Sequence, residues 1–240
     1  MKRNPQAGAI AHSRLHSRNK FCHDVSSPVL LTSLAMTNTN KYEADDPDYD
    51  EAHGVLRNLP GILDPVELER LERAALISAY DRAALSYSEN DSFTQGDVCN
   101  LHRLFLGNIF EWAGEYRRVD LGSDGIRWCH AKHIPNEMAN FERILSRLTP
   151  FSPSLSREEL LSRLAEIHGE LIVIHPFRDG NGRTARMLGD LLLMQANHPP
   201  IQFGAFDDQE IRREYFAAIH DVWEKVDYQR LIALLDRLVR

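Results

Sequence analysis

Apolar residues recur every three or four positions along most of the chain after residue 60, which is the spacing of helices that pack on one face. Asp64-Pro65 is typical of a helix start, because aspartate caps the first amides and proline fits the first turn. Ser156 and Glu159 form the S-x-x-E pattern of a capping box. The pattern predicts helices over residues 64–86, 97–113, 135–148, 156–174, 207–223 and 227–239, and one over "TARMLGDLLLMQAN" that ends at Asn197.

The stretch "EYRRVDLGSDGIRWCH", residues 115–130, breaks this pattern. Two short runs of β-forming residues flank Gly122-Ser123-Asp124-Gly125, which predicts a β-hairpin. Near it, Trp128, His130 and His133 could contact a ligand or a partner, but they are interpreted as exposed turn residues. The fold predicted is all-α, with one hairpin added to the helical domain.

Residues 1–41 show no sustained periodicity and are rich in Ser, Asn, Thr and basic residues, so we expect them to be disordered. We expect residues 42–240 to form one domain. The first 41 residues carry six basic side chains against one acidic one, whereas the whole chain has a net charge of −7. The acidic remainder argues against nucleic-acid binding, which depends on clustered Lys and Arg.

No apolar run is long enough to span a membrane, so we expect no membrane partner. The run from Ser27 to Met36 imitates a signal-peptide core but is short and interrupted by Thr32 and Ser33. A start of translation at Met36 stays open. Three scattered cysteines are typical of a reducing compartment, so we expect a cytoplasmic protein, with delivery into another cell left open.

The candidate chemistry lies in "IHPFRDGNGRTAR", residues 174–186, where one predicted helix ends and the next begins near Asn181 or Gly182. Unpaired amides at a helix N-terminus favour an anion, and Gly180 and Gly182 let the backbone approach it closely. Asn181 adds side-chain donors. Arg183 and Arg186 share a helix face and could each bind phosphate oxygens. A polyanionic phosphate ligand is therefore predicted.

Two further residues of this stretch suggest a reaction. A carboxylate at Asp179, among cationic groups, is explained if it holds a divalent cation against the phosphates, and Mg²⁺ is the usual one. The imidazole of His175 suits proton abstraction near neutral pH. Phe177 is interpreted as a core anchor. A plain His-Pro corner with solvated arginines would not explain Gly-Asn-Gly at the helix entrance, and the chain contains no Walker loop.

The stretch "HPFRDGNGRTAR" matches the motif HxFx[DE]GNGRxxR of the Fic family at every fixed position. Upstream, "LHRLFLGNIFEWAGEYR" resembles the helix and WAGxxR segment of bacterial Fic proteins, and the 115–130 hairpin falls where the family has its target-docking flap. The resemblance covers about residues 42–235.

This resemblance implies transfer of AMP from ATP to a hydroxyl side chain of a target protein. It implies that His175 is the general base, that Asp179 holds Mg²⁺, and that the loop amides and Asn181 bind the α- and β-phosphates. The implied phosphate ligands are Gly180, Asn181, Gly182, Arg183 for the β-phosphate and Arg186 for the γ-phosphate. The GNGR form of the loop favours adenylylation over phosphorylation. Transfer of UMP, phosphocholine or phosphate, and a silent binding module, stay open.

Many Fic proteins inhibit themselves with a helix bearing [ST]xxxE[GN], whose glutamate pairs with the second arginine of the motif. Here Glu89-Asn90 has Leu85, not Ser or Thr, at the fourth position before the glutamate. We therefore expect a separate small inhibitor protein that supplies a glutamate to Arg186. A degenerate internal helix around Glu89, or an oligomer that buries the site, remains an alternative.

Overall fold

The computed structural model describes residues 46–123, 125–201 and 208–239, and these contain seven α-helices and two small antiparallel hairpins. The all-α class is confirmed. One hairpin was missed by the prediction: β1 (Tyr49–Asp50) pairs with β2 (Val55–Leu56) before the first helix. The prediction of disorder for residues 1–41 lies outside the described residues.

Most helices begin and end close to their predicted limits. Asp64 accepts a hydrogen bond from the Val66 amide at 2.8 Å and caps the helix labelled α2. Ser156 and Glu159 exchange the two bonds of the predicted capping box. The helices are α2 (Pro65–Ser86), α4 (Ile134–Leu148), α5 (Arg157–Ile174), α6 (Asn181–Gln195), α7 (Gln209–Lys225) and α8 (Gln229–Leu238).

The predicted helix over 97–113 is too long, because α3 spans only Gln95–Leu106. The chain then continues in turns, and the carbonyl of Ile109 accepts a hydrogen bond from the Leu59 amide at 2.7 Å instead of a helical one. Ile109 and Phe110 are still buried in these turns. The apolar spacing therefore outlasts the helix, since the turn also faces the core.

The predicted hairpin over 115–130 is real but short. Its strands are β3 (Gly122–Ser123) and β4 (Ile126–Arg127), and the 3₁₀ helix η1 (Ala131–His133) follows. We call residues 115–130 the flap, and its other described residues have irregular backbone. Trp128 is buried, so its interpretation as an exposed turn residue is wrong.

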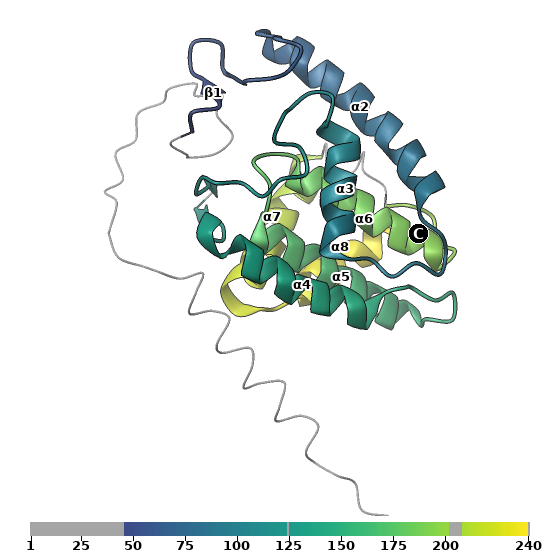
Figure 1. Ribbon diagram of the computed structural model, residues 1–240. Helices are drawn as coiled ribbons and strands as arrows, with labels where there is room; N and C mark the ends of the chain where they lie inside the picture. The colour runs from purple at the N-terminus through teal and green to yellow at the C-terminus, as the bar shows by residue number, and fades with distance from the viewer. Residues whose placement is uncertain (1–45, 124, 202–207, 240) are drawn as a thin grey trace, which may run out of the picture.

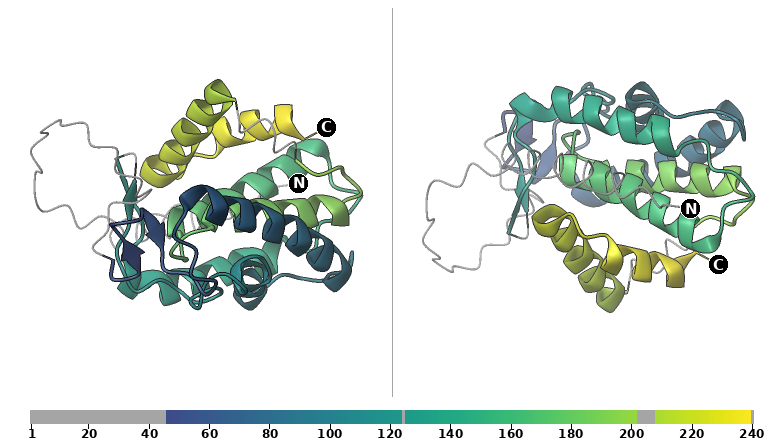
Figure 2. Two further views of the ribbon diagram at one scale, coloured as in Figure 1. Left: turned by 90° about the horizontal axis from the view of Figure 1, so that it is seen from above. Right: turned by 90° about the horizontal axis from the view of Figure 1, so that it is seen from below.

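The helix α5 lies at the centre of the domain and packs against α4, α6, α7 and α8. Figure 1 shows α2 crossing one face over α3 and α6, and Figure 2 shows α7 and α8 covering the opposite side of α5. Leu164 and Leu171 of α5 and Leu188 of α6 are fully buried in this core. The end of α5 and the start of α6 are therefore anchored in the buried core.

In the described part of the chain no helix is long and apolar enough to cross a membrane.

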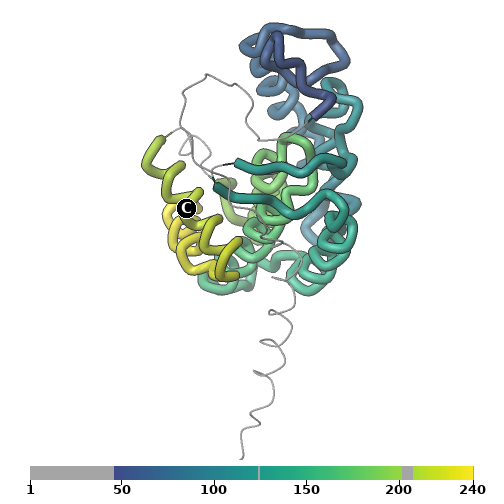
Figure 3. Tube along the Cα trace, turned by 90° about the vertical axis from the view of Figure 1, so that its left-hand side faces the viewer, coloured from purple at the N-terminus to yellow at the C-terminus, as the bar shows by residue number. Residues whose placement is uncertain are grey.

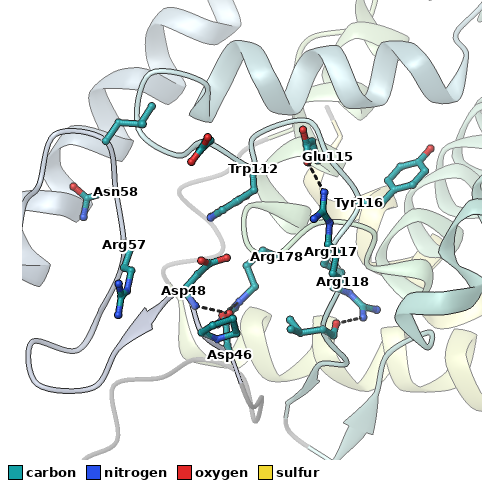
Figure 4. Close-up of a pocket in the computed structure, with 14 residues that line it drawn as sticks. Asp46, Asp48, Arg57, Asn58, Trp112, Glu115, Tyr116, Arg117, Arg118 and Arg178 are labelled. Atoms are coloured by element: carbon teal, nitrogen blue, oxygen red, sulfur yellow. Dashed lines mark hydrogen bonds and ion pairs between the residues drawn. The ribbon is translucent and has the colours of Figure 1, made fainter.

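A buried ion pair joins residues 46–59, which contain β1 and β2 and which we call the N-terminal hairpin segment, to the loop between α5 and α6. The carboxylate of Asp46 pairs with Nε of Arg178, and the two side chains are 2% and 5% exposed. Figure 4 shows this pair beside the strand that leads to Asn58. Charges buried to this degree cost several kcal/mol each unless they are paired.

We predict that Asp46→Asn lowers the free energy of unfolding by about 3 kcal/mol, because it removes a buried charge that pairs with the buried Arg178 guanidinium. Urea denaturation measures the change. Asp48→Asn, at an exposed neighbouring position, is the control and should change stability by less than about 0.5 kcal/mol. A loss below about 1 kcal/mol for Asp46→Asn would mean that water reaches the pair.

Candidate active site

The seven residues predicted to form the site lie together at the junction of α5 and α6. His175 ends α5 in a left-handed conformation with φ 51°, and Gly180 caps α6 at φ 78°. The described helix begins at Asn181, so the amides of its first turn point toward the loop. The helix N-terminus on which the predicted anion site depends is therefore present, and anion binding stays a prediction.

Glycine is required at position 180. A Cβ there would lie 2.9 Å from Cδ1 of Leu106 and 3.1 Å from Nε2 of His102, and the positive φ disfavours any other residue. At Gly182 a Cβ would lie 3.3 Å from Nη1 of Arg186. The contact at Gly182 shows that the Arg186 guanidinium folds back to the first turn of its own helix.

His102 of α3 supports the loop between α5 and α6. Its Nδ1 accepts a hydrogen bond from the Gly114 amide at 2.7 Å, so the proton is on Nε2, which donates to the Asp179 carbonyl at 2.9 Å. The ring stacks on Phe177 with centroids 3.9 Å apart. Burial lowers the pKa of His102 to about 4, which keeps the ring neutral and the two bonds in place at physiological pH.

Asn181 also shapes the loop. Its side chain accepts from the Phe177 amide at 2.9 Å and donates to the Phe177 carbonyl at 2.8 Å, and it is buried. Phe177 itself is fully buried, as expected of a core anchor. Phosphate binding by Asn181 stays a prediction, and its backbone amide is the group that the helix start offers.

The predicted base, His175, is held in one orientation. Its Nδ1 lies 3.0 Å from the carbonyl oxygen of Ile172, which can only accept, so Nδ1 carries the proton in the neutral ring. Trp128 stacks on the ring, with centroids 4.2 Å apart and planes 11° apart. The lone pair of the neutral imidazole is therefore on Nε2, which is the atom that can accept a proton.

Arg117 connects the flap to the loop. Its backbone amide donates to the Pro176 carbonyl at 2.8 Å, and its Nε donates to the His175 carbonyl at 2.8 Å. The same guanidinium donates to the carbonyls of Val119, at 2.7 Å, and Cys129. One buried arginine thus joins both sides of the flap to the residue predicted to be the base.

Arg183 and Asp179 form an ion pair at 2.8 Å, and Arg183 also pairs with Glu72 of α2. Part of the sequence argument for a metal at Asp179 is therefore wrong, because Arg183 already compensates this carboxylate. Among the described residues no group of three or more His, Cys, Asp and Glu side chains could hold a metal ion. Asp179 still fits Mg²⁺, which commonly takes one or two carboxylates plus phosphate oxygens and water.

Arg186 is surrounded by Tyr80, Asp190 and Tyr215, and burial lowers its pKa. Asp190 accepts from the Ile201 amide at 2.8 Å and is hydrogen-bonded to Tyr80. Burial raises the pKa of Asp190 to about 7. The cationic side chain thus lies among polar groups of α2, α6 and α7.

The sequence analysis did not single out three residues of the site, Glu72, His102 and Arg117, and it interpreted a fourth, Trp128, as an exposed turn residue. Glu72 lies in a run of charged residues that is typical of a solvated helix face. His102 and Arg117 occur in the WAGxxR-like segment, so the resemblance included them but spacing alone gave no role. A stacking role for Trp128 has no local sequence signal, because the His175 ring that it stacks on is 47 positions away in sequence.

A cavity of about 670 Å³ lies beside the site, between the N-terminal hairpin segment and the start of the flap. Figure 4 shows Trp112, Tyr116, Arg57 and Arg118 around it. Of the motif residues, Arg178 lines the cavity, whereas the seven predicted site residues do not. The cavity is therefore separate from the helix N-terminus of α6.

The sequence profile of the Fic/DOC family matches residues 92–193, which include α3, the flap and the α5–α6 junction. The chain is 34% identical over 175 residues to "Protein adenylyltransferase VbhT" of Bartonella schoenbuchensis, covering 72% of this chain and 36% of that protein. It is 32% identical over 158 residues to "Probable protein adenylyltransferase Fic" of Salmonella typhimurium, covering 65% of this chain and 76% of that protein. The chain thus spans about a third of the Bartonella relative.

Solved structures agree on the fold. The BepC protein of Bartonella tribocorum, crystallised with bound AMPPNP, matches with a TM-score of 0.66 at 21% identity, over 80% of this chain and 96% of that one. A Fic domain from Bartonella quintana with bound ADP gives a TM-score of 0.66 at 22% identity, over 80% and 94%. With the motif loop, the flap and the Salmonella relative, these matches show that the chain belongs to the Fic/DOC family.

Proposed function

We propose that this protein transfers AMP from ATP to a hydroxyl side chain of a target protein. The observation that carries the proposal is the position of His175, whose Nε2 is the accepting atom of the ring. His175 begins the loop that leads to the N-terminus of α6, where Arg183 and Arg186 lie. A base beside a phosphate site is the arrangement that phosphoryl-group chemistry needs. The relatives named adenylyltransferases support the same reaction.

In this mechanism Nε2 of His175 takes the proton of the target hydroxyl as its oxygen attacks the α-phosphate, and pyrophosphate leaves. The amides of Gly180, Asn181 and Gly182 bind the α- and β-phosphates. Arg183 and Arg186 neutralise the charge on the β- and γ-phosphates. Asp179 would hold Mg²⁺, which supplies charge neutralisation for the phosphates when bound. Trp128 and the Ile172 carbonyl keep the base in its orientation.

The alternatives are transfer of another phosphate-containing group, such as UMP, phosphocholine or phosphate, and a silent binding module. The bound AMPPNP and ADP in the two solved relatives favour an adenine nucleotide. A silent module would be expected to lack the base or the acid, and both His175 and Asp179 are present. We further propose a reducing compartment such as the cytoplasm, because Cys99 and Cys129 are both thiols.

We predict that His175→Ala lowers AMP transfer from radiolabelled ATP by about 10²- to 10⁴-fold, since the general base is lost. ATP binding, measured by calorimetry, should change by less than threefold. His53→Ala, at an exposed position of the N-terminal hairpin segment, is the control and should keep full activity. Transfer by His175→Ala within severalfold of the parent protein would remove His175 from the mechanism.

We also propose that the target adds to the flap as a strand, on the β3 edge. Gly122 and Arg127 face each other as the non-hydrogen-bonded pair next to the Trp128–Leu121 bond, so their own amides and carbonyls point outward. On the β4 edge the Arg127 carbonyl accepts from Nε1 of Trp223 in α7 at 3.1 Å. Figure 3 shows the teal flap reaching toward the yellow-green α7, which blocks strand addition on that side.

Matched proline substitutions test which edge is used. Gly122→Pro removes the outward amide of β3, so we expect target modification to fall at least tenfold while ATP binding is unchanged. Arg127→Pro removes the corresponding amide of β4 and should cost less than threefold. Target modification is followed by mass spectrometry of lysate incubated with enzyme and ATP. Equal losses in both variants would show that the hairpin has only a structural role.

We propose that a separate small protein inhibits the enzyme by placing a glutamate against Arg186. In the structure Glu89 lies in an exposed turn after the end of α2, so it is not on an inhibitory helix. A glutamate bound to Arg186 would occupy donors that the γ-phosphate needs. The inhibitor itself is unidentified.

If the inhibitor is a separate protein, the purified chain should modify itself with ATP. Its expression alone should arrest growth, and His175→Ala should relieve that arrest. Autoradiography and growth curves measure the two effects. An inactive purified chain that becomes active on Glu89→Gly would instead establish an internal inhibitory segment.

A further inference from the structure

Glu72 differs from the other charged residues on α2. Its side chain is 12% exposed, whereas Glu69 and Arg73 on the same helix are 67% and 73% exposed and pair with each other at the surface. A carboxylate withdrawn from water is costly unless it is compensated by a charge and hydrogen bonds. The partner of Glu72 is Arg183, 111 positions away in sequence and in the first turn of α6.

The guanidinium of Arg183 is held on three sides. Glu72 accepts from Nη1, Asp179 accepts from Nη2 at 2.8 Å, and Cζ lies 4.7 Å from the centre of the Phe105 ring. Glu72 therefore occupies the Nη1 end of the guanidinium, and Asp179 occupies the Nη2 end. The side chain of Arg183 is 22% exposed, so this arrangement is not a loose surface pair.

Two carboxylates share one cation in this group, which gives the three side chains a net charge of −1 when all are ionised. The charge of Arg183 is divided between Glu72 and Asp179, so each carboxylate weakens the hold of the other. Without Glu72, Arg183 would be drawn more strongly to Asp179. That carboxylate would then be less available to any other cation.

We propose that Glu72 is a positioning residue, which holds Arg183 in place so that Asp179 can exchange its ion pair for Mg²⁺ and Nη2 can turn to a phosphate. This role rests on the proposed function, in which Asp179 and Arg183 meet the metal and the nucleotide. Glu72 binds Nη1 and leaves Nη2 on the loop side. Its contact therefore orients the donor fork and does not block the end that faces the nucleotide.

The test measures nucleotide binding in the full chain carrying His175→Ala, so that no transfer occurs. ATP binding is followed by calorimetry over a range of Mg²⁺ concentrations. Glu72→Gln keeps the size of the side chain but removes its charge, and should raise the half-saturating Mg²⁺ concentration about tenfold, as loss of one charge-assisted hydrogen bond predicts. Glu69→Gln, one turn earlier on the same helix, is the matched control and should shift it less than twofold.

A second background shows whether Glu72 acts through Arg183. In Arg183→Gln, which itself weakens ATP binding, adding Glu72→Gln should shift the half-saturating Mg²⁺ concentration by less than twofold. A full tenfold shift in that background would overturn the proposal. If Glu72→Gln fails to fold, Glu72→Asp, which keeps the charge but shortens the side chain, replaces it and should give a smaller increase.

Three other results would overturn the role of Glu72. An unchanged Mg²⁺ requirement in Glu72→Gln would show that Arg183 needs no such support. Tighter ATP binding in that variant would make Glu72 a competitor of the nucleotide, and loss of the fold in both Glu72 variants would make it purely structural. If the chain with an intact Glu72 bound no ATP with Mg²⁺, the proposed function itself would fail, and this result is distinct from the others.

Discussion

The hydrogen bond from His102 to the Asp179 carbonyl supports the α5–α6 junction, at which every candidate residue lies. His102 is buried and neutral, so one ring nitrogen accepts from the Gly114 amide and the other donates to the Asp179 carbonyl. It therefore joins the turns that follow α3 to the start of α6. Phe177 stacks on the ring and Asn181 closes the loop around Phe177. These bonds fix the start of α6, whose first-turn amides are the groups that an anion site at a helix N-terminus uses.

Charge balance sets how this site is built. Two arginines at one helix N-terminus repel each other and the helix dipole, so carboxylates have to be near them. Arg183 lies between Asp179 and Glu72, and Arg186 lies near Asp190 and two tyrosines. The cationic groups are therefore positioned before any phosphate binds, which lowers the side-chain entropy that the protein would lose on binding a nucleotide.

The flap and the loop form one unit through Arg117. Its guanidinium bonds the His175 carbonyl and the carbonyls of Val119 and Cys129, so the predicted base and both sides of the flap share one buried side chain. Trp128, which comes directly after the second strand, stacks on the His175 ring. A strand bound on the flap would thus be placed relative to the base by bonds internal to the protein.

The sequence by itself determined the helices and the chemistry of the motif, because both depend on short-range patterns. Apolar spacing and capping residues located most helix ends, and thirteen consecutive residues contained all seven candidates. It overestimated α3 because a buried turn keeps the apolar spacing of a helix, it wrongly placed Trp128 at the surface, and it gave no role to His102 and Glu72. These three act through contacts with residues 47, 77 and 111 positions away. Which side chain meets Asp179, His175 or Arg183 was decided only when α2, α3 and the flap packed against the α5–α6 junction, since burial and charge compensation are properties of the assembled core.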